Sequence, residues 1–109
     1  MANEIEMYRG DTKTITVTVT ANGSAYNLTG TTLVMTVRKY DDGPVVCSNT
    51  MTIKDAAGGI AELTIPSATS AAFLVGSFVY DIELTTSDGK VYTIVKSTFT
   101  VAADVTKPA

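Results

Sequence analysis

The sequence predicts a single all-β domain, a sandwich of about seven antiparallel strands, on three observations. The chain has 19 Thr, 12 Val and 7 Ile among 109 residues, and β-branched side chains of this kind favour strands over helices. Clusters of Gly, Asn and Asp that suit tight turns recur about every 8–12 residues, as they do in sandwiches and barrels. The segments between these turns alternate apolar with polar residues, which is the period of a half-buried strand.

The length supports one domain with one core. A chain of 109 residues is a common size for a single domain and buries roughly two-thirds of its unfolded surface. We expect the domain to span residues 1–106, with residues 107–109 as a short C-terminal tail. The single cysteine, Cys47, allows no disulfide within the chain, which suits a reducing compartment.

The clearest predicted strand covers residues 12–20. Ile15, Val17 and Val19 alternate there with threonines, so we expect one buried face and one face that carries a row of hydroxyl groups. A short strand is expected before it, in the N-terminal arm of residues 1–8. The Arg-Gly-Asp tripeptide that separates the two is interpreted as a turn, because glycine supplies the backbone freedom that a turn needs.

Two further strands are predicted in the middle of the chain. Residues 32–39 direct three alternate apolar side chains inward, namely Leu33, Met35 and Val37. Residues 45–54 are expected to form either one interrupted strand or two short ones, with the interruption around Ser48 and Asn49. Both segments are short enough to be ordinary strands of a sandwich.

A strand over residues 59–65 and a short helix over residues 66–73 are predicted next. The strand points Leu63 and Ile65 inward. Ile60 falls on the opposite face, which requires a bulge or a half-covered outer surface. The following segment begins with proline and is rich in alanine, so we expect one or two helical turns that cross between the sheets. Phe73 and Leu74 are expected to plug the end of the core.

The last two predicted strands cover residues 77–86 and 91–101. The first should be a central strand, with alternate inward side chains from Phe78, Tyr80, Ile82 and Leu84. In the second, the apolar residues change parity along the strand. We therefore expect a β-bulge near Lys96 and Ser97, because one extra residue reverses the face on which the later side chains lie.

The residue inventory predicts no enzyme and no catalytic, cofactor or metal site. The chain contains no histidine, which excludes Ser–His and Cys–His dyads. Cys47 follows two valines and is interpreted as a small buried residue. The acidic turns at Asp41-Asp42 and Asp88-Gly89 lack the alternating spacing of a calcium loop, so turn formation explains them better.

The charge pattern bears on partners and location. A net charge of −3 without a basic run argues against nucleic-acid binding, which depends on clustered Lys and Arg. No apolar stretch approaches the roughly 20 residues that span a bilayer, and the N-terminus lacks the features of a signal peptide. We therefore expect no membrane partner. The lone thiol and the missing signal peptide suit synthesis in a bacterial cytoplasm.

Several short motifs occur in an order that matches a known family. They are Tyr8-Arg9-Gly10-Asp11-Thr12, Asn27-Leu28-Thr29-Gly30, Gly76-Ser77-Phe78-Val79-Tyr80-Asp81-Ile82, Asp88-Gly89-Lys90-Val91-Tyr92-Thr93 and Phe99-Thr100-Val101. This succession, from about Glu4 to Thr106, resembles small immunoglobulin-like structural domains of tailed bacteriophages and prophages. The N-terminal domain of phage baseplate upper proteins is an example. The chain lacks the cysteine pair and core tryptophan of antibody domains.

The resemblance implies a structural protein of the phage virion, located in a baseplate, tail or capsid decoration. Its partners would be other virion proteins and copies of itself, bound by pairing of sheet edges or by packing of the threonine-rich faces, with help from the N-terminal arm. The candidate partner-binding residues are Glu4, Ile5, Met7, Tyr8, Thr14, Thr16 and Thr18.

A receptor- or carbohydrate-binding module of a phage adhesion device is the alternative. Sugar sites commonly stack a sugar ring on an exposed aromatic side chain. The candidates here are Tyr26, Tyr40 and Tyr92, and the sequence contains no tryptophan.

Overall fold

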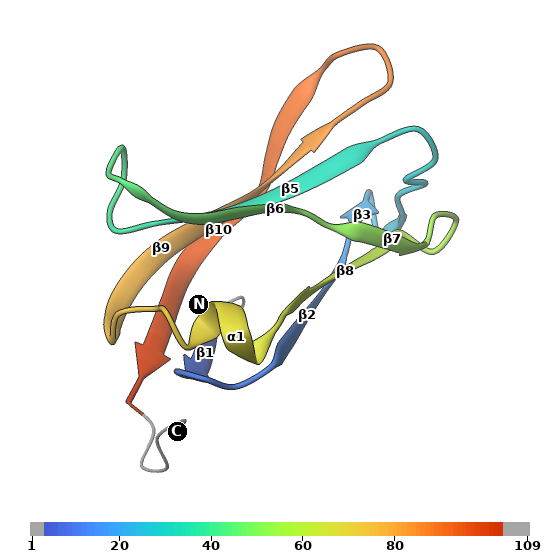
Figure 1. The fold of residues 1–109 in the computed structure, drawn as a ribbon. Helices are drawn as coiled ribbons and strands as arrows, with labels where there is room; N and C mark the ends of the chain where they lie inside the picture. Colours follow the sequence, from blue (N-terminus) through green and yellow to red (C-terminus); the bar gives the residue numbers. More distant parts are fainter. Residues whose placement is uncertain (1–3, 104–109) are drawn as a thin grey trace.

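The computed structural model describes residues 4–103, and these form a sandwich of two β-sheets (Figure 1). The strands in chain order are β1 (Ile5–Tyr8), β2 (Lys13–Thr18), β3 (Thr20–Ala21), β4 (Ser24–Ala25), β5 (Thr32–Arg38), β6 (Val45–Thr50), β7 (Thr52–Asp55), β8 (Ile60–Ile65), β9 (Gly76–Thr85) and β10 (Val91–Ala102). One short helix, α1 (Ser67–Ser70), lies between β8 and β9. The predicted all-β class is confirmed. The expected domain end at residue 106 and the tail of residues 107–109 lie outside the described residues.

The two sheets contain five and three strands. The larger has the order β1-β10-β9-β5-β6 and the smaller the order β2-β8-β7, while β3 and β4 form a separate hairpin. The strand β1 is an exception to the predicted antiparallel arrangement, since it runs parallel to β10 with Ile5 opposite Phe99. The reason is topological: the turn after β1 carries the chain into the other sheet, so β1 and β2 do not form a hairpin.

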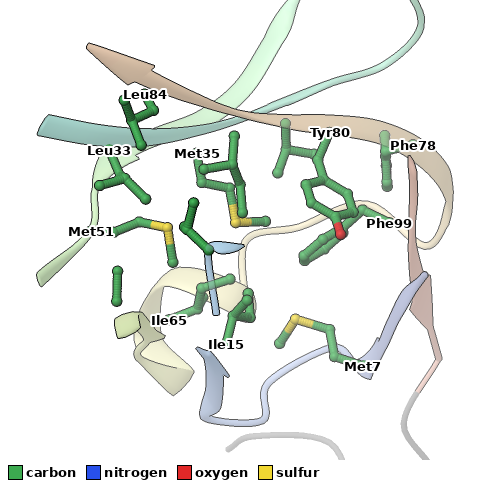
Figure 2. Packing of buried hydrophobic residues seen from close by; sticks show 14 of the residues in the cluster. Met7, Ile15, Leu33, Met35, Met51, Ile65, Phe78, Tyr80, Leu84 and Phe99 are labelled. Atoms are coloured by element: carbon green, nitrogen blue, oxygen red, sulfur yellow. The ribbon is translucent and has the colours of Figure 1, made fainter. Parts of the chain in front are cut away.

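The core lies between the sheets and follows the predicted period of two (Figure 2). The predicted inward side chains that are buried are Ile15, Val19, Leu33, Met35, Val37, Ile65, Phe78, Tyr80, Ile82 and Leu84. Val17 and Leu63 are partly buried at the margin of the core. The ring of Phe99 packs edge to face against Phe73 and Tyr80, with centroid distances of 6.3 and 6.5 Å. This geometry is the favourable one for aromatic pairs.

The chain changes sheets between β6 and β7, at Met51. The Met51 side chain is buried, and its backbone N–H donates to the carbonyl of Leu33 at 2.8 Å. The sequence predicted an interruption, but around Ser48 and Asn49, which instead lie within β6. The break falls at Met51 because this apolar residue remains in the core while the chain crosses from one sheet to the other.

The predicted β-bulge in the last strand is present, but it lies earlier than expected. The register of β10 against β9 shifts between Thr93 and Val95, so the extra residue is Ile94 and not a residue near Lys96 or Ser97. The shift places Val95 opposite Ile82 and Phe99 opposite Phe78. Both parity groups of apolar residues are thereby accommodated on one strand.

The segment after β8 differs from the prediction at its end. Helix α1 follows Pro66 and covers one turn, less than the expected span of residues 66–73. Phe73 is buried as predicted, but Leu74 is 70% exposed, so the expectation that it plugs the core is wrong. Phe73 alone fills the end of the core, where it meets Phe99. Ile60 was expected to need a bulge or a half-covered outer surface. It is half-buried, and the register of the neighbouring strand β7 shifts between Ile53 and Asp55, next to it.

Candidate interaction surfaces

The threonines predicted for partner binding form a hydroxyl row on the outer face of the smaller sheet. Thr14, Thr16 and Thr18 are exposed on β2, as the alternation predicted. Thr14 lies opposite Thr64 of β8, and their Oγ1 atoms are 3.1 Å apart, within hydrogen-bonding distance. At least part of the row therefore satisfies its hydroxyl groups within the sheet.

Charged groups border this hydroxyl row. Glu62 lies between Thr16 of β2 and Thr52 of β7, and its carboxylate is 3.5 Å from the Lys54 ammonium group. Both side chains are solvent-accessible, so the ion pair adds little to stability. The outer face of the smaller sheet is thus a polar surface of hydroxyl and charged groups.

The N-terminal arm is largely incorporated into the fold. Met7 is 4% exposed, and Figure 2 shows its side chain among those of the core. Ile5 is partly buried against the core, whereas Glu4 and Tyr8 are exposed. Met7 therefore serves packing in this fold, and the exposed Tyr8 remains a candidate for partner contacts. Residues 1–3 of the arm lie outside the described residues.

Two strand edges face one another on the side of the sandwich where β1 and β2 lie. In the larger sheet, β1 pairs with β10 only along residues 99–102, and among residues 4–103 no strand pairs with that edge of β10 along residues 91–98. In the smaller sheet, β2 pairs with β8 on one side and is the outermost strand on the other. We name the groove between these edges the β2–β10 seam.

The β2–β10 seam has an apolar floor. Two adjoining cavities of about 270 and 490 Å³ lie along it and share Thr16, Val17 and Val95 in their walls. Val17, Ile94 and Val95 are only partly buried, although all three pack against the core. The core is therefore incompletely covered here, at a place where backbone hydrogen-bonding groups of edge strands are also exposed.

A buried hydroxyl group holds the turn between β1 and β2. Ser70 of α1 is fully buried, and its Oγ accepts a hydrogen bond from the Gly10 N–H at 3.0 Å. The same hydroxyl donates to the Asp11 carbonyl at 2.7 Å. These two residues form the turn between β1 and β2, so Ser70 ties the edges of both sheets to the helix. The sequence offered no signal for this role, because the partners are 59 and 60 residues apart.

A third cavity lies on another side of the sandwich, between β6 and the loop that joins α1 to β9. Its volume is about 330 Å³. The residues that line it are Val46, Cys47, Thr69, Ala72, Phe73, Leu74 and Phe78. We name this surface the Leu74 patch. Cys47 was predicted to be buried, but it is only partly buried, because it lies on the edge strand β6. Desolvation by this partial burial raises the pKa of its thiol.

The outer face of the larger sheet carries a charged groove of about 350 Å³. Within it, the Lys96 ammonium group is 2.8 Å from an Asp41 carboxylate oxygen, and this contact raises the pKa of Lys96. Arg38 donates to the carbonyl of Gly43 at 2.7 Å. In the part of the chain that the structure describes, no group of three or more His, Cys, Asp or Glu is placed to hold a metal ion.

The fold and these surfaces can be compared with known proteins. The family whose sequence pattern matches is the BppU N-terminal domain, that is, the N-terminal domain of the phage baseplate upper protein, and the match covers residues 1–107. The chain belongs to this family. It is accordingly a structural domain of the phage baseplate. The predicted resemblance is confirmed, and of the three expected locations in the virion the family supports the baseplate.

Solved structures agree with the family assignment at the level of fold. The N-terminal domain of phage TP901-1 ORF48 matches with a TM-score of 0.65 and 13% identity, over 90% of this chain and 83% of that one. CopC from Methylosinus trichosporium OB3b matches with a TM-score of 0.55 and 17% identity, over 92% and 84% of the two chains. At these identities the similarities show a shared fold alone. A comparison with curated proteins found no match.

The aromatic residues of the alternative prediction do not form one surface in this baseplate-family domain. Tyr40 lies in the turn before β6, and Tyr92 lies near the start of β10 in a hairpin that projects from the sandwich (Figure 1). Tyr26 is partly buried against the core. None of the three lines the grooves described above, so sugar binding stays a prediction. In residues 4–103 no helix is long and apolar enough to cross a membrane.

Proposed function

We propose that this domain attaches a baseplate protein to a neighbouring virion protein. In this proposal an extended segment of the neighbouring protein binds as an added strand in the β2–β10 seam. The observation that carries the proposal is the pair of strand edges that face one another across a half-covered apolar floor. The family supports a role in the baseplate, and the seam supplies a mechanism for attachment. We also propose that the role involves no catalytic step; the sequence contains no histidine, the commonest general base near neutral pH.

Strand addition uses two features that the seam combines. The backbone N–H and C=O groups of an edge strand can pair with an incoming strand and give affinity. Alternate side chains of that strand would cover Val17, Ile94 and Val95, whose partial exposure leaves apolar surface to bury. Because β2 has 6 residues, a partner segment of matching length would extend roughly 20 Å along the seam.

The remaining predicted residues lie around the same groove. Glu4, Ile5, Thr14 and Thr16 all line the cavity nearest β1. We propose that these side chains contact the incoming segment beside the backbone ladder, and that the outer hydroxyl row faces a neighbouring protein in the virion. We also propose that copies of the domain associate, and that the protein enters the virion after synthesis in the host cytoplasm.

Hydrogen exchange on the unmodified protein tests strand addition directly. The probe is purified phage tail that lacks this protein, mixed with the full chain. Amide exchange should slow in residues 13–18 and 91–98, because a new strand would use the exposed N–H groups there. Residues 45–50 of β6, also at a sheet edge, provide the internal comparison and should not change. Binding without protection at either edge of the seam would contradict the proposal.

Two substitutions distinguish the seam from the outer threonine face. Val17→Lys places a charge on the apolar floor. Thr64→Lys adds the same charge on the outer face of the smaller sheet, at an exposed position of β8 that lines neither cavity of the seam. If strand addition at the seam is correct, Val17→Lys should weaken binding to the tails at least about tenfold, with a smaller loss for Thr64→Lys. A larger effect of Thr64→Lys would favour packing of the threonine face. Circular dichroism checks that both variants are folded.

A further inference from the structure

We propose that the strand which binds in the β2–β10 seam carries a basic side chain, Lys or Arg, at the end that lies beside Glu4 and Glu6. This inference rests on the strand addition proposed above, and it adds the chemistry of the partner and the orientation in which the partner binds. The occupant is an extended segment of a virion protein, with alternate apolar side chains and one cationic end.

Glu4 and Glu6 lie where the open edge of β10 ends. Pairing between β1 and β10 starts at Ile5, which lies opposite Phe99, so Glu4 comes directly before the first paired residue. Both glutamates are exposed, and both line the cavity of about 270 Å³ in the seam. A strand that is added along residues 91–98 of β10 therefore has one of its ends beside these two carboxylates.

The two carboxylates are not neutralised by the part of the chain that the structure describes. None of the ion pairs within residues 4–103 includes Glu4 or Glu6. Lys13 lines the same cavity, but it too forms no ion pair there. The lining of this cavity thus carries two negative charges and one positive charge. It attracts a cationic side chain of a partner and repels a carboxylate.

The other end of the seam carries no charge. The adjoining cavity of about 490 Å³ is lined only by threonine, valine and isoleucine residues. A segment with one basic residue therefore fits in one orientation, with the basic residue beside the glutamates and its apolar side chains over Val17, Ile94 and Val95. The reverse orientation would place the cation against apolar groups, where its desolvation is not compensated by an ion pair.

Binding of the full chain to purified phage tails that lack this protein tests the charge requirement. Glu4→Gln and Glu6→Gln should each weaken binding about two- to fivefold, and the double variant about tenfold, because each removes part of the attraction. Glu83→Gln is the matched control. Glu83 is exposed on β9 and lines neither cavity of the seam, so its loss should leave binding nearly unchanged.

Salt supplies a second readout of the same charges. Added NaCl should weaken binding of the unmodified protein, because salt screens exposed charges. Binding of the double variant Glu4→Gln/Glu6→Gln should depend on salt much less. The Glu83→Gln control should keep the salt dependence of the unmodified protein.

Lys13→Gln provides a test with the opposite sign. Lys13 repels a basic side chain in the same cavity, so its neutralisation should strengthen binding about two- to fivefold. A substitution that only disturbs the groove would weaken binding whichever charge it removed. Opposite effects of Glu6→Gln and Lys13→Gln therefore identify charge as the cause. Circular dichroism checks that all variants are folded.

Hydrogen exchange separates this inference from strand addition itself. Suppose that the tails protect residues 13–18 and 91–98, but the Glu4 and Glu6 variants bind like Glu83→Gln, or Lys13→Gln fails to strengthen binding. The basic end of the partner is then wrong, and strand addition stands. If neither edge of the seam is protected, strand addition is wrong and the inference is overturned with it.

Discussion

At the scale of single residues, Ser70 combines complete burial with bonds to a distant part of the chain. Its hydroxyl accepts from Gly10 and donates to Asp11, and both partners lie in the turn that leads from one sheet to the other. A buried hydroxyl with good partners adds only modestly to stability, but removing it leaves a backbone donor and a backbone acceptor without their partner. Ser70 is therefore the residue through which α1 positions β1 and β2.

Ser70→Ala should lower the free energy of unfolding by about 1–3 kcal/mol, because it removes the partner of two backbone groups. Urea denaturation followed by circular dichroism measures the change. Ser67→Ala, an exposed position in the same helical turn, is the control and should cost no more than about 0.5 kcal/mol. Equal effects at the two positions would show that the buried hydrogen bonds contribute nothing.

At the scale of elements, backbone contacts dock the β3–β4 hairpin onto the turn between β7 and β8. The Val19 N–H donates to the Gly59 carbonyl at 2.7 Å, and the Leu28 N–H donates to the Ala56 carbonyl at 2.9 Å. Gly59 adopts a φ of 72°, and a Cβ there would lie 2.5 Å from the carbonyl oxygen of Val19. The close approach of these two connections requires glycine for both reasons.

Gly59→Ala should destabilise the domain by about 2–4 kcal/mol, since it combines an unfavourable φ with a steric clash against backbone. Gly23→Ala is the matched control, because Gly23 has a similar φ of 80° but no atom within 4 Å of the added Cβ. It should cost about 1–2 kcal/mol. Thermal unfolding of both variants measures the difference, and equal losses would rule out the clash as a cause.

At the scale of the whole molecule, several described groups have a raised pKa, and these groups make the folded chain less stable as the pH becomes alkaline. Burial raises the pKa of the Cys47 thiol and of the Tyr80 hydroxyl. The hydrogen bond with Asp41 raises the pKa of Lys96, although solvent screens this exposed pair. Each group binds its proton more tightly in the folded chain, so the unfolded chain ionises first as the pH rises.

In the range from neutral to alkaline pH, we therefore expect the free energy of unfolding to be highest near neutral pH. It should fall as the pH rises above about 8.5, the ordinary pKa of a cysteine thiol. Urea midpoints at pH 7, 9 and 10 check the direction. Cys47→Ala should flatten the first part of the decline and Tyr80→Phe the later part, each compared with its own value at pH 7. A midpoint that rises with pH would contradict the assignment.

Particular residues show how far the sequence predicted the fold. The alternation of Ile15, Val17 and Val19 with threonines correctly predicted which side chains point inward and which form the hydroxyl row. The change of parity in the last strand correctly required a bulge, but its position depends on pairing with β9, and the extra residue is Ile94. The alternation of apolar and polar residues along a strand is a local property. The position at which the register between two strands shifts depends on both strands.

The candidate surfaces were predicted less completely. Thr14, Thr16 and Thr18 are exposed as expected, but Met7 contributes to the core because β1 pairs with β10. Leu74 was expected inside and is outside, since only one of two adjacent apolar residues after a single helical turn can fill the end of the core. Neither the β2–β10 seam nor the Leu74 patch could be predicted, because each combines residues from distant strands.

The sequence by itself determined the all-β class, the approximate strands, their buried faces and the family. The class, the strands and their faces follow from β-branched composition, turn residues and a period of two, all of which act within a few residues of the chain. The family follows from the resemblance carried by the order of short motifs. Only the tertiary structure decided that β1 runs parallel to β10, that the chain changes sheets at Met51, and that two strand edges stay open beside a half-covered floor. Strand order and the places where a core is left uncovered depend on contacts between distant segments, and a local pattern does not encode them.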